Sequence, residues 1–304
     1  MTAVLHGVAP LTRLGVIRAS GEEAAKFLHN QLTQDFALLD DRHARLAAFC
    51  SAKGRMLASF IGFRHGADIL LVCNADLLAP TLKRLSMFVL RAKVKLSDAS
   101  AEFRVSGLAG ASLAAFASAP VEVWGKTDLG AACVIRLYPA DDVERALWVA
   151  PANEPQPDGP ALDETLWQWG EVRSGVGLLN AANVEAFVPQ MLNYESVGGV
   201  NFKKGCYPGQ EVVARSQYRG TLKRRGYLLH CDAPMAAGQE VFHEADAGQP
   251  AGAVAQAAPS PHGGWDAIAS LQVGATEGGR LTLGSAQGPH CALQPLPYLL
   301  LADV

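Results

Sequence analysis

The sequence changes character after Gly220, and this change narrows the folds that the chain can adopt. Beyond that point, short β-like runs are separated by Gly and Pro turns, and no convincing helix appears. The runs cover residues 227–231, 240–243, 252–257, 267–273, 280–283 and 291–293. Such spacing is typical of a small all-β barrel. Residues 296–301 are flanked by proline, and we expect them to close the barrel or to form its edge.

The first 220 residues mix helices and strands without a regular βαβ alternation. A capping-box pattern at Ser20-Gly21-Glu22-Glu23 predicts the start of one helix, and further helices are predicted for 77–90, 109–117 and 162–172. Strands are predicted for 14–19, 45–50, 55–63, 68–73, 94–96, 102–105, 121–124, 132–137 and 147–149. This order favours an α+β fold with antiparallel sheets over a doubly wound sheet. We therefore predict two domains, residues 1–220 and 221–304, with the Pro-rich stretch 153–160 as a surface loop.

Composition excludes several classes of protein. Hydrophobic residues make up 49% of the chain, charged residues 18%, and the net charge is −3, as in ordinary water-soluble globular proteins. No apolar run approaches the ~20 residues that span a bilayer, and residues 1–14 lack a signal-peptide pattern. We therefore expect a cytoplasmic protein without a membrane partner. The six cysteines and eight histidines show no metal-binding spacing, so we expect reduced thiols and no permanent metal.

One stretch, residues 201–215 (NFKKGCYPGQEVVAR), concentrates chemically active side chains. Pro208 suits the first turn of a helix, and Glu211 and Arg215 are spaced to form an i,i+4 ion pair. Cys206 would then lie just before a helix N-terminus and beside two lysines, which together favour the thiolate and lower the pKa of the thiol. The alternative is an ordinary loop–helix junction with an inert cysteine. We interpret Cys206 as a reactive thiol, and the other cysteines as packing residues: Cys50, Cys73, Cys133, Cys231 and Cys291.

Residues 204–215, Lys-Gly-Cys-Tyr-x-Gly-Gln-Glu-Val-Val-Ala-Arg, resemble the signature of the YgfZ family. These are folate-binding proteins related to the glycine-cleavage aminomethyltransferase. The resemblance extends to residues 187–193, 198–202, 218–220 and 223–225, and more weakly to 27–35 and 50–55. It implies a folate-binding body of two similar α+β halves followed by a C-terminal β-barrel. It also implies that Cys206 is the functional thiol and that tetrahydrofolate or a derivative is held by Arg173, Lys204, Gly205, Tyr207, Gln210, Glu211 and Arg215.

The segment from Lys203 to Arg225 is strongly basic inside a mildly acidic chain. It holds one acid, Glu211, and seven basic residues: Lys203, Lys204, Arg215, Arg219, Lys223, Arg224 and Arg225. A solvated surface run is the ordinary explanation for such a segment. Because this run is continuous with the thiol motif, we favour an anionic ligand, such as a folate glutamate tail, a phosphate or RNA.

The chain departs from the aminomethyltransferase branch at two places. That branch carries Arg-x-Glu-x-Gly, whereas residues 173–177 read Arg-Ser-Gly-Val-Gly and lack the carboxylate. The branch also has a catalytic aspartate after a Gly turn, and the equivalent residues 53–60 contain no acid. Methylene transfer needs a positioned carboxylate, so we do not expect a classical enzyme. Asp35 and Glu171 lie nearby in sequence, and we interpret both as helix-end or surface residues.

Three functions from different classes remain open. The first, implied by the resemblance, is a folate-binding accessory protein that assembles or repairs iron–sulfur clusters in client enzymes, including enzymes that modify tRNA. The second is a folate-dependent one-carbon transferase. The third is an RNA-binding module that uses the basic segment, with no small-molecule site. No P-loop, no nucleophile elbow and no complete dinucleotide fingerprint occurs in the sequence, which argues against other enzyme classes.

Overall fold

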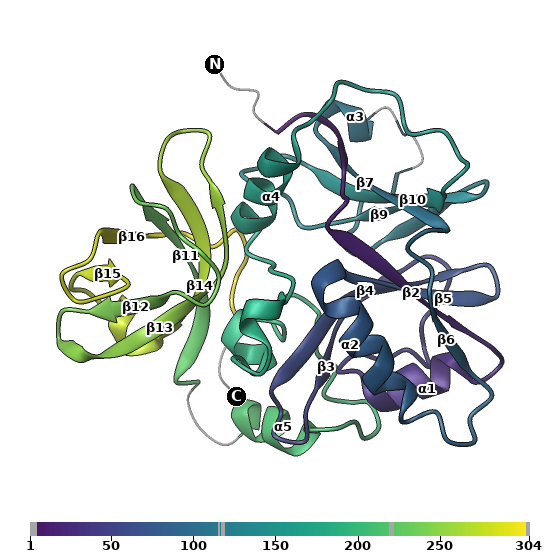
Figure 1. Ribbon diagram of the computed structural model, residues 1–304, viewed down its shortest axis with the longest axis horizontal. Coiled ribbons are helices and arrows are strands. Elements are labelled where there is room, and N and C mark those ends of the chain that lie inside the picture. Colours follow the sequence, from purple (N-terminus) through teal and green to yellow (C-terminus); the bar gives the residue numbers. More distant parts are fainter. Residues whose placement is uncertain (1–4, 115, 117–118, 219–221, 302–304) are drawn as a thin grey trace.

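The structure, a computed structural model, describes residues 5–114, 116, 119–218 and 222–301. Two five-stranded sheets form the body, and a closed six-stranded barrel stands at its side (Figure 1). All the strand pairs that the structure describes within these sheets are antiparallel. The predicted α+β class and the C-terminal barrel are therefore confirmed.

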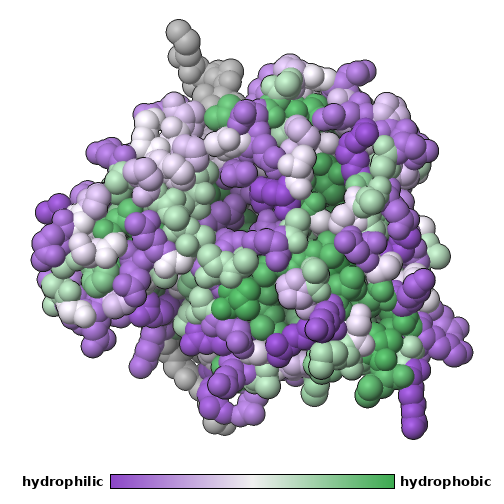
Figure 2. All heavy atoms as spheres, in the orientation of Figure 1, coloured by the Kyte–Doolittle hydropathy of each residue, from purple (hydrophilic) through white to green (hydrophobic). Residues whose placement is uncertain are grey.

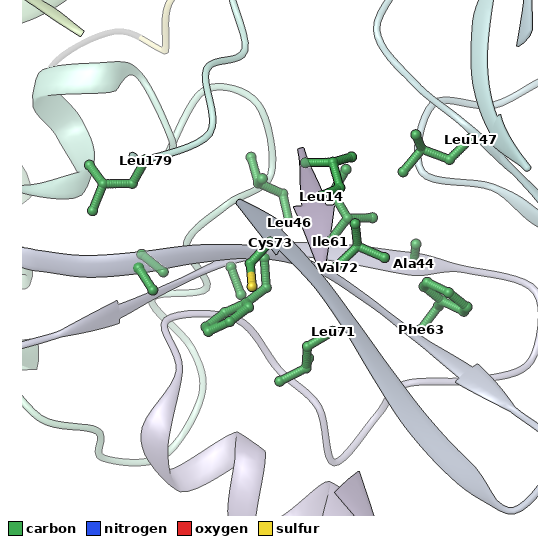
Figure 3. Packing of buried hydrophobic residues seen from close by; sticks show 14 of the residues in the cluster. Leu14, Ala44, Leu46, Ile61, Phe63, Leu71, Val72, Cys73, Leu147 and Leu179 are labelled. Carbon is green, nitrogen blue, oxygen red and sulfur yellow. The ribbon is translucent and has the colours of Figure 1, made fainter. Parts of the chain in front are cut away.

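The first half of the body is a sheet with the order β3-β4-β5-β2-β6. Its strands are β2 (Leu14–Ser20), β3 (Ala44–Cys50), β4 (Met56–His65), β5 (Asp68–Asn74) and β6 (Lys95–Asp98). Helices α1 (Ala24–Gln31) and α2 (Ala75–Ser86) pack against it. The central strands β4 and β5 are buried along nearly their whole length, because both faces of the sheet are covered. Successive side chains such as Leu71 and Val72 point to opposite faces (Figure 3).

The second half is a sheet with the order β1-β7-β10-β9-β8. Its strands are β1 (Gly7–Pro10), β7 (Phe103–Ala109), β8 (Lys126–Leu129), β9 (Ala132–Arg136) and β10 (Arg145–Pro151). The helices of this half are α3 (Ala111–Ala114) and α4 (Glu164–Arg173). Trp167 and Trp169 of α4 are buried and belong to the core. The body thus consists of two antiparallel five-stranded halves.

The barrel closes in the order β11-β14-β13-β12-β15-β16. Its strands are β11 (Arg224–Cys231), β12 (Glu240–His243), β13 (Asp246–Pro259), β14 (Trp265–Gln272), β15 (Leu281–Leu283) and β16 (His290–Gln294), with a short 3-10 turn η3 (Val273–Thr276). Closure comes from pairing of β11 with β16. The expectation for 296–301 was wrong, because this segment forms no strand up to Leu301, the last residue described. The Tyr298 hydroxyl instead donates to the Gly175 carbonyl of the body at 2.8 Å.

Several predicted elements differ from the structure. Residues 121–124 form a turn, because Trp124 adopts a positive φ of 65°. The capping box fails because the Glu23 carboxylate accepts the Lys93 N–H at 2.7 Å instead of capping α1. Helix α2 ends at Ser86, short of the predicted residue 90. The helix predicted for 109–117 is reduced to α3, although residues 115 and 117 lie outside the described part. Strands β1 and β8 were not predicted.

The junction of body and barrel is built from polar contacts around two 3-10 turns, η1 (Ala181–Asn183) and η2 (Pro189–Leu192). Asn193, in a left-handed conformation, donates to the Gly226 carbonyl at 2.8 Å and accepts its N–H at 3.0 Å. Glu195 pairs with Arg225 at 2.8 Å, and both side chains are buried. The predicted domain boundary after residue 220 lies outside the described residues. Helix α5 (Gln210–Tyr218) is the last described element of the body.

Candidate functional site

The six cysteines, all of them described, differ sharply in exposure. Cys206 is exposed, and the other five are buried. Burial raises the pKa of Cys50, Cys73 and Cys133 to about 12, which makes these thiols poor nucleophiles at neutral pH. Cys231 and Cys291 lie opposite each other on β11 and β16. The predicted packing role of these five agrees with their burial, and Cys206 is the accessible thiol.

Lys204 anchors the loop that carries Cys206 (residues 201–209, the Cys206 loop). Its ammonium donates to the carbonyl oxygens of His29 and Leu32 at 2.5 and 2.9 Å, and it lies 4.5 Å from the centre of the Tyr207 ring. Burial lowers the pKa of Lys204 to about 8, although electrostatic interactions with Asp35 and Cys206 oppose this shift. Tyr207 is itself buried, and burial raises the pKa of its hydroxyl. In this arrangement Lys204 and Tyr207 position the loop, and their predicted contact with folate stays a prediction.

A histidine–carboxylate pair lies beside the Cys206 loop. His29 Nδ1 and Asp35 Oδ1 are 3.0 Å apart, and Asp35 also accepts the Leu38 N–H at 3.0 Å. Burial pulls the pKa of Asp35 up, but these two hydrogen bonds outweigh it and the pKa is lowered. The other ring nitrogen, Nε2, faces Gly205, where an added Cβ would lie 3.3 Å away. Gly205 therefore lets the loop approach the histidine closely.

The loop enters α5 through a sharp turn at Gly209. Gly209 has φ +79°, and a Cβ there would lie 2.4 Å from the Ser51 carbonyl of the β3–β4 hairpin, so only glycine fits. Helix α5 begins at Gln210, two residues after Pro208, so Pro208 lies in the preceding turn and not in the helix. The Gln210 amide donates to the carbonyls of Lys204 and Gly205, both at 3.5 Å. The loop is thus held at both ends.

Residues upstream of the loop act as its scaffold. The Gln190 amide donates to the Val213 carbonyl of α5 at 2.7 Å. The Thr33 hydroxyl donates to the Gly199 carbonyl at 2.6 Å, and the Thr33 carbonyl accepts the Asn201 N–H at 2.9 Å. Segments 187–193 and 198–202, which carry the sequence resemblance, therefore help to position the Cys206 loop.

The structure divides the basic segment into buried and exposed cations. Lys204 and Arg225 are buried, and Arg224 donates to the Ala251 carbonyl of the barrel at 2.7 Å. Arg215 is exposed and forms the expected ion pair with Glu211. Lys203 and Lys223 are exposed as well, whereas Arg219 lies outside the described residues. An anionic ligand would meet a smaller positive surface here than the sequence indicates.

Arg173 lies apart from the other predicted folate-binding residues. It is at the end of α4, where its guanidinium forms a two-pronged ion pair with Asp141 at 2.7–3.0 Å. Figure 1 shows α4 and α5 well separated in the body. The structure therefore brings six of the predicted residues together around the Cys206 loop, and it places Arg173 elsewhere: Lys204, Gly205, Tyr207, Gln210, Glu211 and Arg215.

A second polar cluster lies in a cavity between the two sheets. Leu14 and Ile61 of the first sheet and Leu147 of the second line it from opposite sides (Figure 3). Glu171 lies at its edge, where the carboxylate pairs with Arg13 and accepts the Trp167 indole N–H at 2.9 Å.

Asp35 and Glu171, interpreted as helix-end or surface residues, are not surface residues, although Glu171 does lie in the last turn of α4. Both are buried, each with 9% of its surface exposed, and both are hydrogen-bonded. In α4, the i,i+4 spacing of Trp167 and Glu171 is the sequence signal that could have revealed the second carboxylate. His29 was not singled out at all, because its partner lies six residues away, beyond the end of α1.

The cavity offers groups that suit a pterin in kind but not in size. A pterin needs a carboxylate for its aminopyrimidine edge and flat apolar walls, and the lining contains Glu171, Tyr138 and Trp124. Both oxygens of Glu171 already accept hydrogen bonds, one from Trp167 and the other from Arg13 and Gln256, so a pterin would have to replace one of these partners. The Nε of Arg145 is buried, and among the described residues it has no hydrogen-bond partner, so a donor is free. Burial lowers the pKa of Arg145 to about 10, against the opposing effect of Glu171. The cavity volume is about 30 Å³, room for a single water molecule.

Two features are absent from the described part of the chain. None of its helices is long and apolar enough to cross a membrane. Nor do three or more His, Cys, Asp or Glu side chains gather there as a group that could hold a metal ion. The absence of a permanent metal stays a prediction.

Comparisons with known proteins point to one family. The tRNA-modifying protein YgfZ of Pectobacterium carotovorum is 33% identical over 229 residues, which cover 69% of this chain and 66% of that protein. The Escherichia coli O157:H7 protein of the same name is 31% identical over 219 residues, covering 69% and 67%. The Hamiltonella defensa protein is 30% identical over 234 residues, covering 71% and 67%. No family model matches the sequence.

A solved structure shares the fold. The aminomethyltransferase T of the glycine cleavage system from Bartonella henselae superposes with a TM-score of 0.68 over 97% of this chain and 86% of that one. The two sequences are 16% identical, so this likeness concerns architecture alone. The two-sheet body and the barrel are therefore an aminomethyltransferase-type fold.

Proposed function

The chain belongs to the YgfZ family, and from that premise we propose that it is a folate-binding accessory protein that uses the Cys206 thiol to maintain iron–sulfur clusters in client enzymes. The relatives are named for tRNA modification, so the proposed clients include enzymes that modify tRNA. The observation that carries the proposal is the exposure of Cys206 on a loop anchored by Lys204 and faced by His29 and Asp35.

Tetrahydrofolate or a derivative is the proposed ligand of the body. The pterin would occupy the cavity beside Glu171, where Arg145 Nε offers a free donor. Entry requires the cavity walls to move apart, since the closed cavity holds only about 30 Å³. When bound, the folate would supply one-carbon chemistry, and the chain's own residues would orient it and exclude water.

Calorimetric titration with reduced folates tests this part of the proposal. We expect binding to the unmodified protein and at least a tenfold loss of affinity in Glu171→Gln. Arg173→Gln, whose side chain pairs with Asp141 and does not line the cavity, is the matched comparison. No heat with any reduced folate, at concentrations well above those in cells, would rule out folate as the ligand.

A one-carbon transferase is the second candidate, and one observation favours it. The chain lacks carboxylates at the expected motif positions, yet it places Glu171 beside the cavity and hydrogen-bonds Asp35 to His29. Steady turnover of methylene-tetrahydrofolate with a protein-bound or free amine would favour this candidate. Binding without turnover favours the accessory role.

A further inference from the structure

A groove with mostly apolar lining and two basic residues, Lys83 and Arg84, lies on the face of the body formed by α2. Its hollow measures about 570 Å³. The floor is made by Phe49 of β3, Leu57 of β4 and Leu77 of α2, all buried. Figure 2 shows apolar surface over α2 interrupted by hydrophilic side chains. The groove is distinct from the cavity between the sheets.

Large apolar side chains stand exposed along this groove. Met87 is 69% exposed, Phe88 44% and Val184 42%, and all three line the hollow. Leu90, directly after them in the chain, is 86% exposed. Water-soluble proteins rarely leave such residues grouped on the surface unless a partner covers them. The grouping therefore marks an interaction surface.

The helix and following segment that form one wall of the groove are rich in basic residues. Residues 77–97 contain five basic side chains and no acid: Lys83, Arg84, Arg91, Lys93 and Lys95. Lys93 pairs with Glu22 at 2.6 Å, but no ion pair holds Lys83, Arg84 or Arg91 within the ranges that the structure describes. Lys83 and Arg84 themselves line the hollow.

Two acids lie close to the groove in sequence. The Asp76 carboxylate accepts the Ala181 N–H at 2.9 Å, and Glu185 follows Val184 at one wall. Neither belongs to the lining, so the surface that a partner meets is apolar at its floor and positive at its rim.

We propose that this groove is a docking surface for an amphipathic helix of a partner protein, with apolar side chains in the hollow and acidic side chains on its flanks. A concave groove with walls from α2 and the Val184 segment suits a helix laid lengthwise. A lipid surface is flat and would not fill the hollow, whereas a helix can. A small ligand would need several converging polar groups on the floor, which consists of apolar side chains.

The groove is connected to the Cys206 loop through the β3–β4 hairpin. Phe49 and Leu57 belong to the same β-hairpin whose turn, at Ser51 and Gly54, supports α5 behind the Cys206 loop. A partner seated in the groove is thereby placed on the element that carries the loop. The docking itself needs neither the thiol nor a folate, so it can be tested whether or not the proposed function holds.

The test uses labelled helical peptides of about 16 residues with one apolar face and flanks of Glu, Gln or Lys. We expect the Glu peptide to bind with a Kd on the order of 10 µM, the Lys peptide at least tenfold more weakly, and the preference to fade in high salt. The Lys83→Glu/Arg84→Glu double variant should reverse the order of the two peptides. Phe88→Ser should weaken all three.

Matched variants keep the result interpretable. Lys26→Glu/Arg280→Glu changes two exposed cations elsewhere, and Leu299→Ser removes an apolar side chain that is 92% exposed, so neither should alter binding. All variants should unfold at the temperature of the unmodified protein. Equal affinity for the Glu and Lys peptides, or insensitivity to the groove variants, would overturn the proposal. So would groove-dependent binding of phosphatidylserine vesicles without peptide binding.

Discussion

The Cys206 loop and the cavity beside Glu171 are opposite in character. The loop holds an exposed thiol on a backbone fixed by buried groups such as Lys204. The cavity holds a buried carboxylate, paired with Arg13, in a space with room for one water molecule. One region exposes its thiol to solvent, and the other encloses its carboxylate.

The two regions also differ in how they are encoded in the sequence. Lys204, Gln210 and the upstream Gln190 donate hydrogen bonds to backbone carbonyls, so these motif residues help to specify the shape of one loop. The cavity is assembled from β2, β4, β10 and α4, and no continuous motif marks it. If this division is correct, substitutions in the cavity should affect stability and ligand binding, and substitutions in the loop should affect reactivity.

Removing the carboxylate of Glu171 should have the largest effect on stability. Glu171→Ala leaves Arg13 without its closest charge partner and the Trp167 indole N–H without an acceptor. We expect the free energy of unfolding to fall by about 3 kcal/mol. Urea denaturation followed by tryptophan fluorescence measures this change.

Glu164 provides the matched control for Glu171. It lies on the same helix and also faces Arg13, at 3.9 Å, but in a more exposed position. Glu164→Ala should cost about 0.5 kcal/mol. Equal losses of stability in the two variants would show that the buried Glu171 cluster contributes no more than an exposed ion pair.

Loss of the Lys204 ammonium should have the next largest effect. Lys204→Met leaves the carbonyls of His29 and Leu32 without their donor, and we expect it to cost about 2 kcal/mol. Lys203→Met, at an exposed position next to it, should change stability by less than about 0.5 kcal/mol. A small cost for Lys204→Met would contradict the anchoring role.

The pH dependence of stability tests the same lysine. Burial lowers the pKa of Lys204 to about 8, from 10.5 in a model side chain. Between these values the unfolded chain binds more protons than the folded one, so the free energy of unfolding should rise with pH across this window. Below pH 8 the cost of burying the charge is fully present. Chemical denaturation at pH 7 to 10 should show this rise in the unmodified protein relative to Lys204→Met, and a constant difference would contradict it.

The smallest predicted effect concerns the reactivity of the thiol. His29→Gln should lower the alkylation rate of Cys206 by about threefold with little change in stability, because we expect the imidazole, whose Nε2 faces the loop at Gly205, to assist deprotonation of the neighbouring thiol. His43 and Asp40 form a similar pair, with Nδ1 and Oδ1 2.8 Å apart, on the surface. His43→Gln should leave the rate unchanged, and equal effects of the two substitutions would exclude a role for His29.

Local patterns predicted most of the fold. Period-2 runs and turns located all six barrel strands, and Asp163 capped α4 close to the expected start. The misses arose where tertiary contacts override local preference. Strand β1 exists because β7 offers it an edge, and residues 121–124 turn because the Trp124 N–H and carbonyl bond Arg136 and Ala44.

The site was predictable only in its contiguous part. Exposure of Cys206 and burial of the other cysteines followed from their sequence surroundings. The engagement of Lys204 with carbonyls of residues 29 and 32 did not, because those partners are more than 170 positions away. Glu171 was misjudged for the same reason, since Arg13 meets it only after the two sheets pack together.

Complementation of a null strain tests most directly whether function depends on the thiol of Cys206. Cys206→Ser should accumulate to the level of the unmodified protein and bind folate equally well, yet fail to restore growth or activity of iron–sulfur enzymes. Cys73→Ala, which alters a buried thiol, should restore both. Full complementation by Cys206→Ser would contradict the account and leave the motif with a structural role alone.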